Sequence, residues 1–176
     1  MSPDPVDNYR RDVRTAKEFA RNIAESSQIE RDIINRFALR FEQVHGRKPV
    51  IEDNGCGNDG RLLKSSEVTM AADYLLNGEP LEVKYNRQVL RRFRFKAEQL
   101  KSYIEQGARV LWVNGYCTNR PVFMVLSIET LKEIQVNKDP IPFLPWGGKL
   151  CYELEADEFG WNCLDKQQTE RRGHHG

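Results

Sequence analysis

Apolar residues near the start of the chain recur at intervals of three and four, the spacing of an amphipathic helix. The pattern predicts one helix over residues 7–24 and a second that continues to about residue 44. We expect Ser26 and Ser27 to separate them, because Ser27 followed three residues later by Glu30 has the spacing of a helix-opening capping box. The N-terminal quarter of the chain is therefore predicted to be helical, in two pieces.

Farther along the chain the apolar runs become short and are broken by glycine, asparagine and proline, which is typical of strands. A brief strand is predicted at residues 49–51. Two further strands are predicted within residues 67–86, on either side of Asn77-Gly78, the dipeptide best suited to a type I′ hairpin turn. This hairpin is the most informative local feature of the chain.

The second half of the chain begins with a predicted helix over residues 93–106, which Gly107 ends. Two buried strands are predicted at 108–116 and 121–128, and a short helix at 129–134. The order helix, helix, strand, hairpin, helix, strand, strand predicts an α/β fold around a mixed sheet.

A two-residue turn at Asn77-Gly78 sets the register of the strands on either side of it. Counting outward from the turn, Asp73 stands opposite Glu82. Residues directly opposite each other in an antiparallel pair hold their Cβ atoms about 4.5–5.5 Å apart on one face. Alternation along the strand places Lys84 on that same face. The turn therefore predicts two carboxylates and one amine side by side.

Two opposed carboxylates destabilise a strand pair unless a cation lies between them. Magnesium prefers such oxygen ligands and is commonly held by one or two carboxylates together with substrate phosphates and water. A cation here could polarise a phosphoryl oxygen, and Lys84 could orient the attacking water or stabilise charge on phosphorus. The arrangement suits phosphodiester hydrolysis. The simpler alternative is a solvated hairpin face with three exposed charged side chains.

The composition is that of an ordinary soluble protein, with 39% apolar and 30% charged residues among 176. No apolar run is long enough for a membrane helix, and the N-terminal residues lack the apolar core of a secretory signal. We therefore expect a cytoplasmic protein without membrane contact. The four cysteines form no closely spaced pair, which favours free thiols. An alternative is a zinc site that combines Cys151 and Cys163 with His174 and His175.

The net charge is only +1, but the basic residues are unevenly distributed. Acidic residues such as Glu153 and Glu155 gather elsewhere, and local basic surface is what attracts phosphates. Phe93 and Phe95, which lie within the basic run, could stack on bases or pack in the core. A solvated helix face is the alternative interpretation of the run, whose basic members are Arg87, Arg91, Arg92, Arg94, Lys96 and Lys101.

The spacing of Asp73 and Glu82-x-Lys84 resembles the motif of the PD-(D/E)xK nuclease superfamily. A helix bearing Glu30 precedes the motif and a helix bearing Gln99 follows it. Residues 29–34 resemble the first helix of the archaeal Holliday-junction resolvase and phage nuclease branches. The similarity covers about residues 28–128, although Ala72 stands where the motif's name has proline.

The resemblance implies a restriction-endonuclease-like core, a mixed β-sheet of order αβββαβ flanked by helices. Asp73 and Glu82 would bind the metal together with the backbone carbonyl of Val83, and Lys84 would position or activate water. Glu30 would complete the acidic cluster, unless it serves only in the capping box. Gln99 would support the site or contact the DNA backbone, and its alternative is an ordinary exposed helix residue.

The expected protein is thus a magnesium-dependent DNA endonuclease, with manganese substituting for magnesium and no small-molecule cofactor. Its substrate is DNA, the basic run would contact phosphates, and cutting both strands of a duplex would favour a homodimer. We expect a helical extension at 1–27, the nuclease core at 28–134 and an irregular C-terminal extension at 135–176. The alternatives are a restriction or exonuclease member of the same superfamily, and a non-catalytic DNA-binding or assembly protein on a nuclease-like fold.

Overall fold

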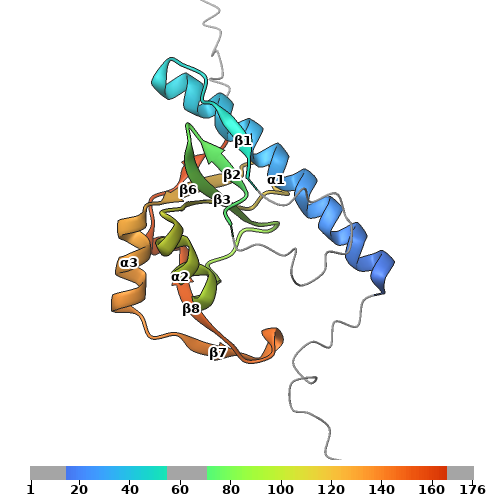
Figure 1. Cartoon of the computed structure of the whole chain (residues 1–176), viewed down its shortest axis with the longest axis vertical. Coiled ribbons are helices and arrows are strands. Elements are labelled where there is room, and N and C mark those ends of the chain that lie inside the picture. The colour runs from blue at the N-terminus through green and yellow to red at the C-terminus, as the bar shows by residue number, and fades with distance from the viewer. Residues whose placement is uncertain (1–14, 55–70, 166–176) are drawn as a thin grey trace, which may run out of the picture.

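The computed structural model describes residues 15–54 and 71–165, which form a mixed α/β fold (Figure 1). Its first element is α1, a single helix over Ala16–His45. The predicted break at Ser26 and Ser27 is therefore wrong. Thr15 is the N-cap, and its side chain accepts a hydrogen bond from the backbone of Glu18 in a capping box. Residues 7–14 of the predicted first helix lie outside the described residues.

The helix continues through its two serines because tertiary packing outweighs their weak helix propensity, which amounts to a few tenths of a kcal/mol per residue. Its buried stripe begins immediately after them, at Ile29, and continues through Ile33, Ile34 and Phe37. Glu30 therefore lies in the interior of a helix and does not cap one.

Within residues 15–54 and 71–165, the large sheet has six strands in the order β1-β2-β3-β5-β6-β9. Neighbouring strands are antiparallel except for β3 and β5, which are parallel. This confirms the predicted α/β class and mixed sheet, with the first strand two residues later than expected. The strands are β1 Ile51–Asp53, β2 Tyr74–Leu76, β3 Glu79–Asn86, β5 Arg109–Asn114, β6 Val122–Leu126 and β9 Asn162–Cys163.

The hairpin between β2 and β3 has the predicted turn and register. Asn77 and Gly78 both have positive φ, 51° and 84°, as a type I′ turn requires. Leu76 pairs with Glu79, and the ladder ends where Tyr74 pairs with Leu81. Since β3 continues to residue 86, its edge on this side has no partner strand beyond Leu81 within the described residues.

Between β3 and β5 the chain forms strand β4, Arg92–Lys96, and then helix α2, Ala97–Gln106. The prediction of a helix from residue 93 is therefore wrong for its first four residues. Phe93 and Phe95 alternate with charged neighbours at period two, and both rings are buried. The strand is stabilised by antiparallel pairing with β8, Lys149–Glu155.

β4, β8 and β7 (Ile141–Phe143) form a second, three-stranded sheet. The prediction that the chain after residue 135 is irregular is wrong for the part that the structure describes. Tyr152 and Leu154 alternate into the core, so β8 follows the usual half-buried pattern. The short helices η3 (Leu144–Trp146) and η4 (Ala156–Glu158) flank this strand, and α3, Ile128–Asn137, extends the predicted short helix at both ends.

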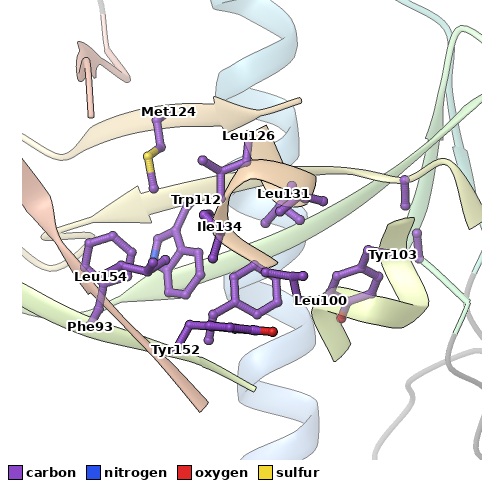
Figure 2. Close-up of a cluster of buried hydrophobic side chains, with 14 residues drawn as sticks. Phe93, Leu100, Tyr103, Trp112, Met124, Leu126, Leu131, Ile134, Tyr152 and Leu154 are labelled. Carbon is purple, nitrogen blue, oxygen red and sulfur yellow. The ribbon is translucent and has the colours of Figure 1, made fainter. Parts of the chain in front are cut away.

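The large sheet is covered on both faces (Figure 1). Helix α1 packs on one face through a cluster that includes Leu81 and Val83 of β3. Helices α2 and α3 and the small sheet pack on the other face, around Trp112, Phe93 and Leu131 (Figure 2). None of the helices within the described ranges is long and apolar enough to cross a membrane. Because Leu81 and Val83 face α1, their alternate neighbours Glu82 and Lys84 face α2 and β4.

Candidate active site

Glu82 and Lys84 lie on the part of β3 that extends beyond its pairing with β2. Their side chains are only 11% and 18% exposed, and Oε1 of Glu82 is 3.6 Å from Nζ of Lys84. Burying two charges is unfavourable unless each is paired or hydrogen-bonded. The structure therefore places this pair on one face, as the sequence predicts, and the pair is not part of a solvated surface.

Asp73, the residue just before β2, lies at the same place. Its Oδ2 accepts a hydrogen bond of 3.3 Å from the backbone N–H of Val83. Burial, the Glu82 carboxylate and the Glu30 carboxylate together raise the pKa of Asp73 from 3.8 to about 8. Although the ladder stops one residue earlier, Asp73 lies beside Glu82 as the turn predicts.

Glu30 adds a third acid from α1. Its pKa is raised from 4.5 to about 7, first by burial and then by the Glu82 carboxylate. It accepts a hydrogen bond of 3.3 Å from the hydroxyl of Ser26, which also lies 3.0 Å from the hydroxyl of Tyr85. Of the two roles left open for Glu30, the capping box is excluded, and membership of the acidic cluster fits its position.

Helix α2 supplies the neutral groups of the site. Oε1 of Gln99 accepts a hydrogen bond of 3.0 Å from Nζ of Lys84, so Gln99 is not merely an exposed helix residue. One turn later, the hydroxyl of Tyr103 donates a 2.7 Å hydrogen bond to Oε1 of Glu82. Sequence reasoning missed Tyr103. Its spacing of four from Gln99, which places both on one face of a helix, is the signal that could have found it.

Tyr103 and Phe95 also shield the amine of Lys84. Its Nζ lies 5.4 Å from the centre of the Tyr103 ring and 5.5 Å from that of Phe95, within the range of a cation–π contact. Burial, together with the charge and hydrogen bond of Glu82, raises the pKa of the Tyr103 hydroxyl, so this group remains a donor at neutral pH.

The acidic cluster opens into a cleft of about 360 Å³. Ser26 and Glu30 of α1, Glu82 and Lys84 of β3, and Trp146 of η3 all contribute to its lining. A larger hollow of about 630 Å³ lies between α3 and β6 and contains the Lys138–Glu158 ion pair. The smaller cleft, and not this larger hollow, is lined by Glu30, Glu82 and Lys84.

The carboxylates have oxygens to offer a divalent cation. In the part of the chain that the structure describes, Tyr103 and Lys84 both contact Oε1 of Glu82, and Val83 contacts Oδ2 of Asp73. Oε2 of Glu82 and Oδ1 of Asp73 have no hydrogen-bond partner among these residues. The donor set suits magnesium, although the described residues contain no group of three His, Cys, Asp or Glu side chains that could hold a metal ion. Substrate oxygens and water would have to complete the coordination.

Within the described residues, four of the six residues of the basic run pair with acids, and three of these acids lie about sixty residues away in the sequence. Because β4 pairs with β8, Arg92 lies opposite Glu155 and Arg94 opposite Glu153. Their ion-pair distances are 2.7 and 3.2 Å. Two other members pair with acids on α1 and α2, namely Arg87 with Glu25 at 2.9 Å and Lys101 with Glu105 at 4.0 Å.

Only part of the run therefore borders the candidate site. Arg94 and Lys96 line the cleft, whereas Arg91 is exposed and lies outside its lining. Phe93 and Phe95 are 3% and 1% exposed, so both pack in the core and neither is available to stack on a base.

Two of the cysteines, Cys117 and Cys151, are free thiols, as the sequence favours. Cys151 is buried on β8, and burial raises the pKa of its thiol. His174 and His175 of the alternative zinc set lie outside the described residues, as does Cys56.

Comparison of the chain with protein-family models, curated proteins and solved structures found no match.

Proposed function

We propose that this protein is a metal-dependent DNA endonuclease that hydrolyses phosphodiester bonds, with Asp73, Glu82 and Lys84 as its active-site residues. One observation carries the proposal: the buried Glu82, the half-buried Asp73 and a lysine meet where β3 extends beyond its pairing with β2, with Nζ of Lys84 only 3.6 Å from Glu82. A third acid, Glu30, lies close enough to raise the pKa of Asp73. Clustered buried acids are unfavourable for folding, so a functional reason for keeping them is required.

Asp73, Glu82 and the backbone carbonyl of Val83 would hold magnesium, for which manganese would substitute. A divalent cation at this place supplies the charge that polarises a phosphoryl oxygen and lowers the pKa of water. Lys84 would orient the attacking water or stabilise the charge that develops on phosphorus. Gln99 fixes the amine of Lys84, and Tyr103 fixes one oxygen of Glu82, leaving the other for the cation.

The order of elements supports membership of the PD-(D/E)xK superfamily. α1, β1, β2, β3, α2 and β5 follow the αβββαβ order of its restriction-endonuclease-like core, with β4 inserted before α2. The inserted strand and the β7–β8 segment would be additions of this chain to that core. We expect the protein to act on DNA in the cytoplasm, and cleavage of both strands of a duplex would favour a homodimer.

The proposal is tested by incubating the protein with supercoiled plasmid and with branched DNA in magnesium, manganese or EDTA. We expect cleavage with either metal and none with EDTA. Lys84→Ala should lower the rate about 100-fold or more, as expected for loss of a charge-stabilising group. Lys132→Ala, which removes an exposed lysine of α3, is the matched control and should leave the rate unchanged. Cleavage that survives Lys84→Ala contradicts the proposal.

A non-catalytic DNA-binding or assembly protein on a nuclease-like fold is the second candidate. The lack of a three-ligand metal group among the described residues favours it. DNA binding by folded wild-type protein, without cleavage in either metal, would decide for this candidate.

A further inference from the structure

The cleft extends from the acidic cluster to a cation and an aromatic ring that the proposed chemistry does not use. Lys96 ends β4, and Trp146 ends the short helix η3 between β7 and β8. Nζ of Lys96 lies 5.2 Å from the centre of the indole ring, in cation–π contact. Both residues line the same cleft as Glu82 and Lys84.

Of the three cationic side chains that line this cleft in the described part of the chain, only Lys96 lacks an ion-pair partner among the described residues. Lys84 and Arg94 each lie beside a carboxylate. Lys96 forms no ion pair with any other described residue. Burial and the nearby ammonium groups of Lys149 and Lys84 lower the pKa of Lys96. An anion placed here would relieve that like-charge repulsion.

Trp146 is not a core residue. Its side chain is half-buried, and Leu144, two residues earlier on η3, is 85% exposed. Phe143 packs against the indole with ring centres 4.8 Å apart and ring planes 78° apart, so the two rings meet edge to face and do not stack flat. A partly exposed ring next to a cation is the combination that binds the bases and phosphates of unpaired strands.

We infer that Trp146 and Lys96 bind one nucleotide of single-stranded DNA beside the acidic cluster, with its base on the indole and a phosphate at the ammonium. Stacking of this kind needs a base face that a continuous duplex covers with the next base pair. The inference rests on the proposed nuclease function and narrows its substrate to DNA with a single-stranded or frayed segment at the cleavage point.

Binding is measured by fluorescence anisotropy in EDTA, with a labelled single strand and a blunt duplex of the same sequence, so that the result does not depend on cleavage. We expect tighter binding of the single strand. Trp146→Ala should raise the Kd for the single strand about 5- to 100-fold and leave the Kd for the duplex within about twofold. Trp146→Phe, which keeps a stacking ring, should bind the single strand more tightly than Trp146→Ala.

Lys96→Ala tests the phosphate contact independently of the indole. It should weaken single-strand binding and reduce the dependence of log Kd on log salt concentration by about 0.7. Lys101→Ala removes the same charge from a side chain of α2 that is 70% exposed and does not line the cleft, and it should change the Kd less than about twofold.

Duplex binding as tight as single-strand binding would overturn the inference, and so would equal single-strand Kd values for Lys96→Ala and Lys101→Ala. The cleavage assay separates this inference from the function on which it rests. If single-strand binding depends on Trp146 but no metal-dependent cleavage occurs, the nucleotide site is supported and the nuclease function is contradicted. If duplex cleavage needs Lys84 but not Trp146, the nuclease function is supported and the nucleotide site is contradicted.

Discussion

The hydroxyl of Tyr103 donates a 2.7 Å hydrogen bond to Oε1 of Glu82, and this buried contact joins α2 to β3. A partner of this kind would orient Glu82 as a ligand of the proposed metal. The bond therefore predicts that Tyr103 affects metal affinity without touching the metal.

Tyr103→Phe removes that hydrogen bond and keeps the ring. We expect the magnesium concentration for half-maximal cleavage to rise about 10- to 100-fold, with a smaller change in the rate at saturating metal. Tyr152→Phe removes a hydroxyl from another buried tyrosine, one that does not line the cleft, and serves as the control. Equal metal dependence in the two variants would refute the positioning role of Tyr103.

Asp73 should make the stability of the metal-free protein depend on pH. Its pKa in the folded protein, about 8, lies above the ordinary value of 3.8. Its contribution to stability is therefore complete below about pH 4 and is lost as the pH rises through 8. We expect the melting temperature measured in EDTA to fall between about pH 5 and pH 9.

Asp73→Asn should reduce this fall in melting temperature and raise the melting temperature at pH 8, because it removes a buried charge. It should also abolish the stabilisation that we expect magnesium to give the wild type. Asp139→Asn, at an exposed aspartate outside the cleft, is the control and should retain the wild-type profile. A melting temperature of the wild type that does not change over this pH range would contradict the prediction.

The arginines of β4 should contribute little to DNA binding. Arg92 is paired with Glu155 at 2.7 Å, so its charge is largely neutralised. We expect Arg92→Ala to raise the Kd for DNA less than twofold, whereas Lys96→Ala raises it several-fold. The comparison is made by anisotropy at one fixed salt concentration. A larger loss of DNA affinity for Arg92→Ala than for Lys96→Ala would contradict this prediction and support the continuous basic surface that the sequence suggests.

The hairpin turn should determine whether the site forms. Gly78 has φ of 84°, where a Cβ is unfavourable, although nothing in the structure obstructs it sterically. Gly78→Ala should lower the free energy of unfolding by about 1 kcal/mol or more, measured by urea denaturation. Gly160→Ala, at a glycine with ordinary φ and open space around it, should have a much smaller effect. Equal losses would show that backbone strain at the turn is not the cause.

The local part of the site could be predicted from the sequence. A two-residue Asn-Gly turn determines strand register over a few residues, so Asp73 and Glu82 could be paired by counting. The side-chain bond of Gln99 to Lys84 connects α2 to β3. The family resemblance suggests Gln99 as a support of the site or a DNA contact, but it does not specify Lys84 as the partner.

The long-range part could not be predicted. Strand β4 depends on β8, more than fifty residues later, and the adjacent helical pattern extends misleadingly into it. For the same reason the pairing of Arg94 with Glu153 could not be predicted from the sequence. Most of the acids that pair with the basic run are distant from it in the sequence. The prediction of a helix break at Ser26 is wrong because the weak helix propensity of serine is outweighed by tertiary packing. Trp146 lies at the cleft because β7 pairs with β8. The residues around Trp146 in the sequence form no pattern that predicts this position.

Crystals of the wild type soaked in manganese test the metal site directly, because the anomalous scattering of the ion locates it without reference to activity. The proposed site predicts a peak between Asp73 and Glu82, within about 2.5 Å of an oxygen from each, and no such peak in crystals of Asp73→Asn. Absence of a peak between these two carboxylates, in crystals where manganese is bound elsewhere, would contradict the proposed site and the nuclease function built on it.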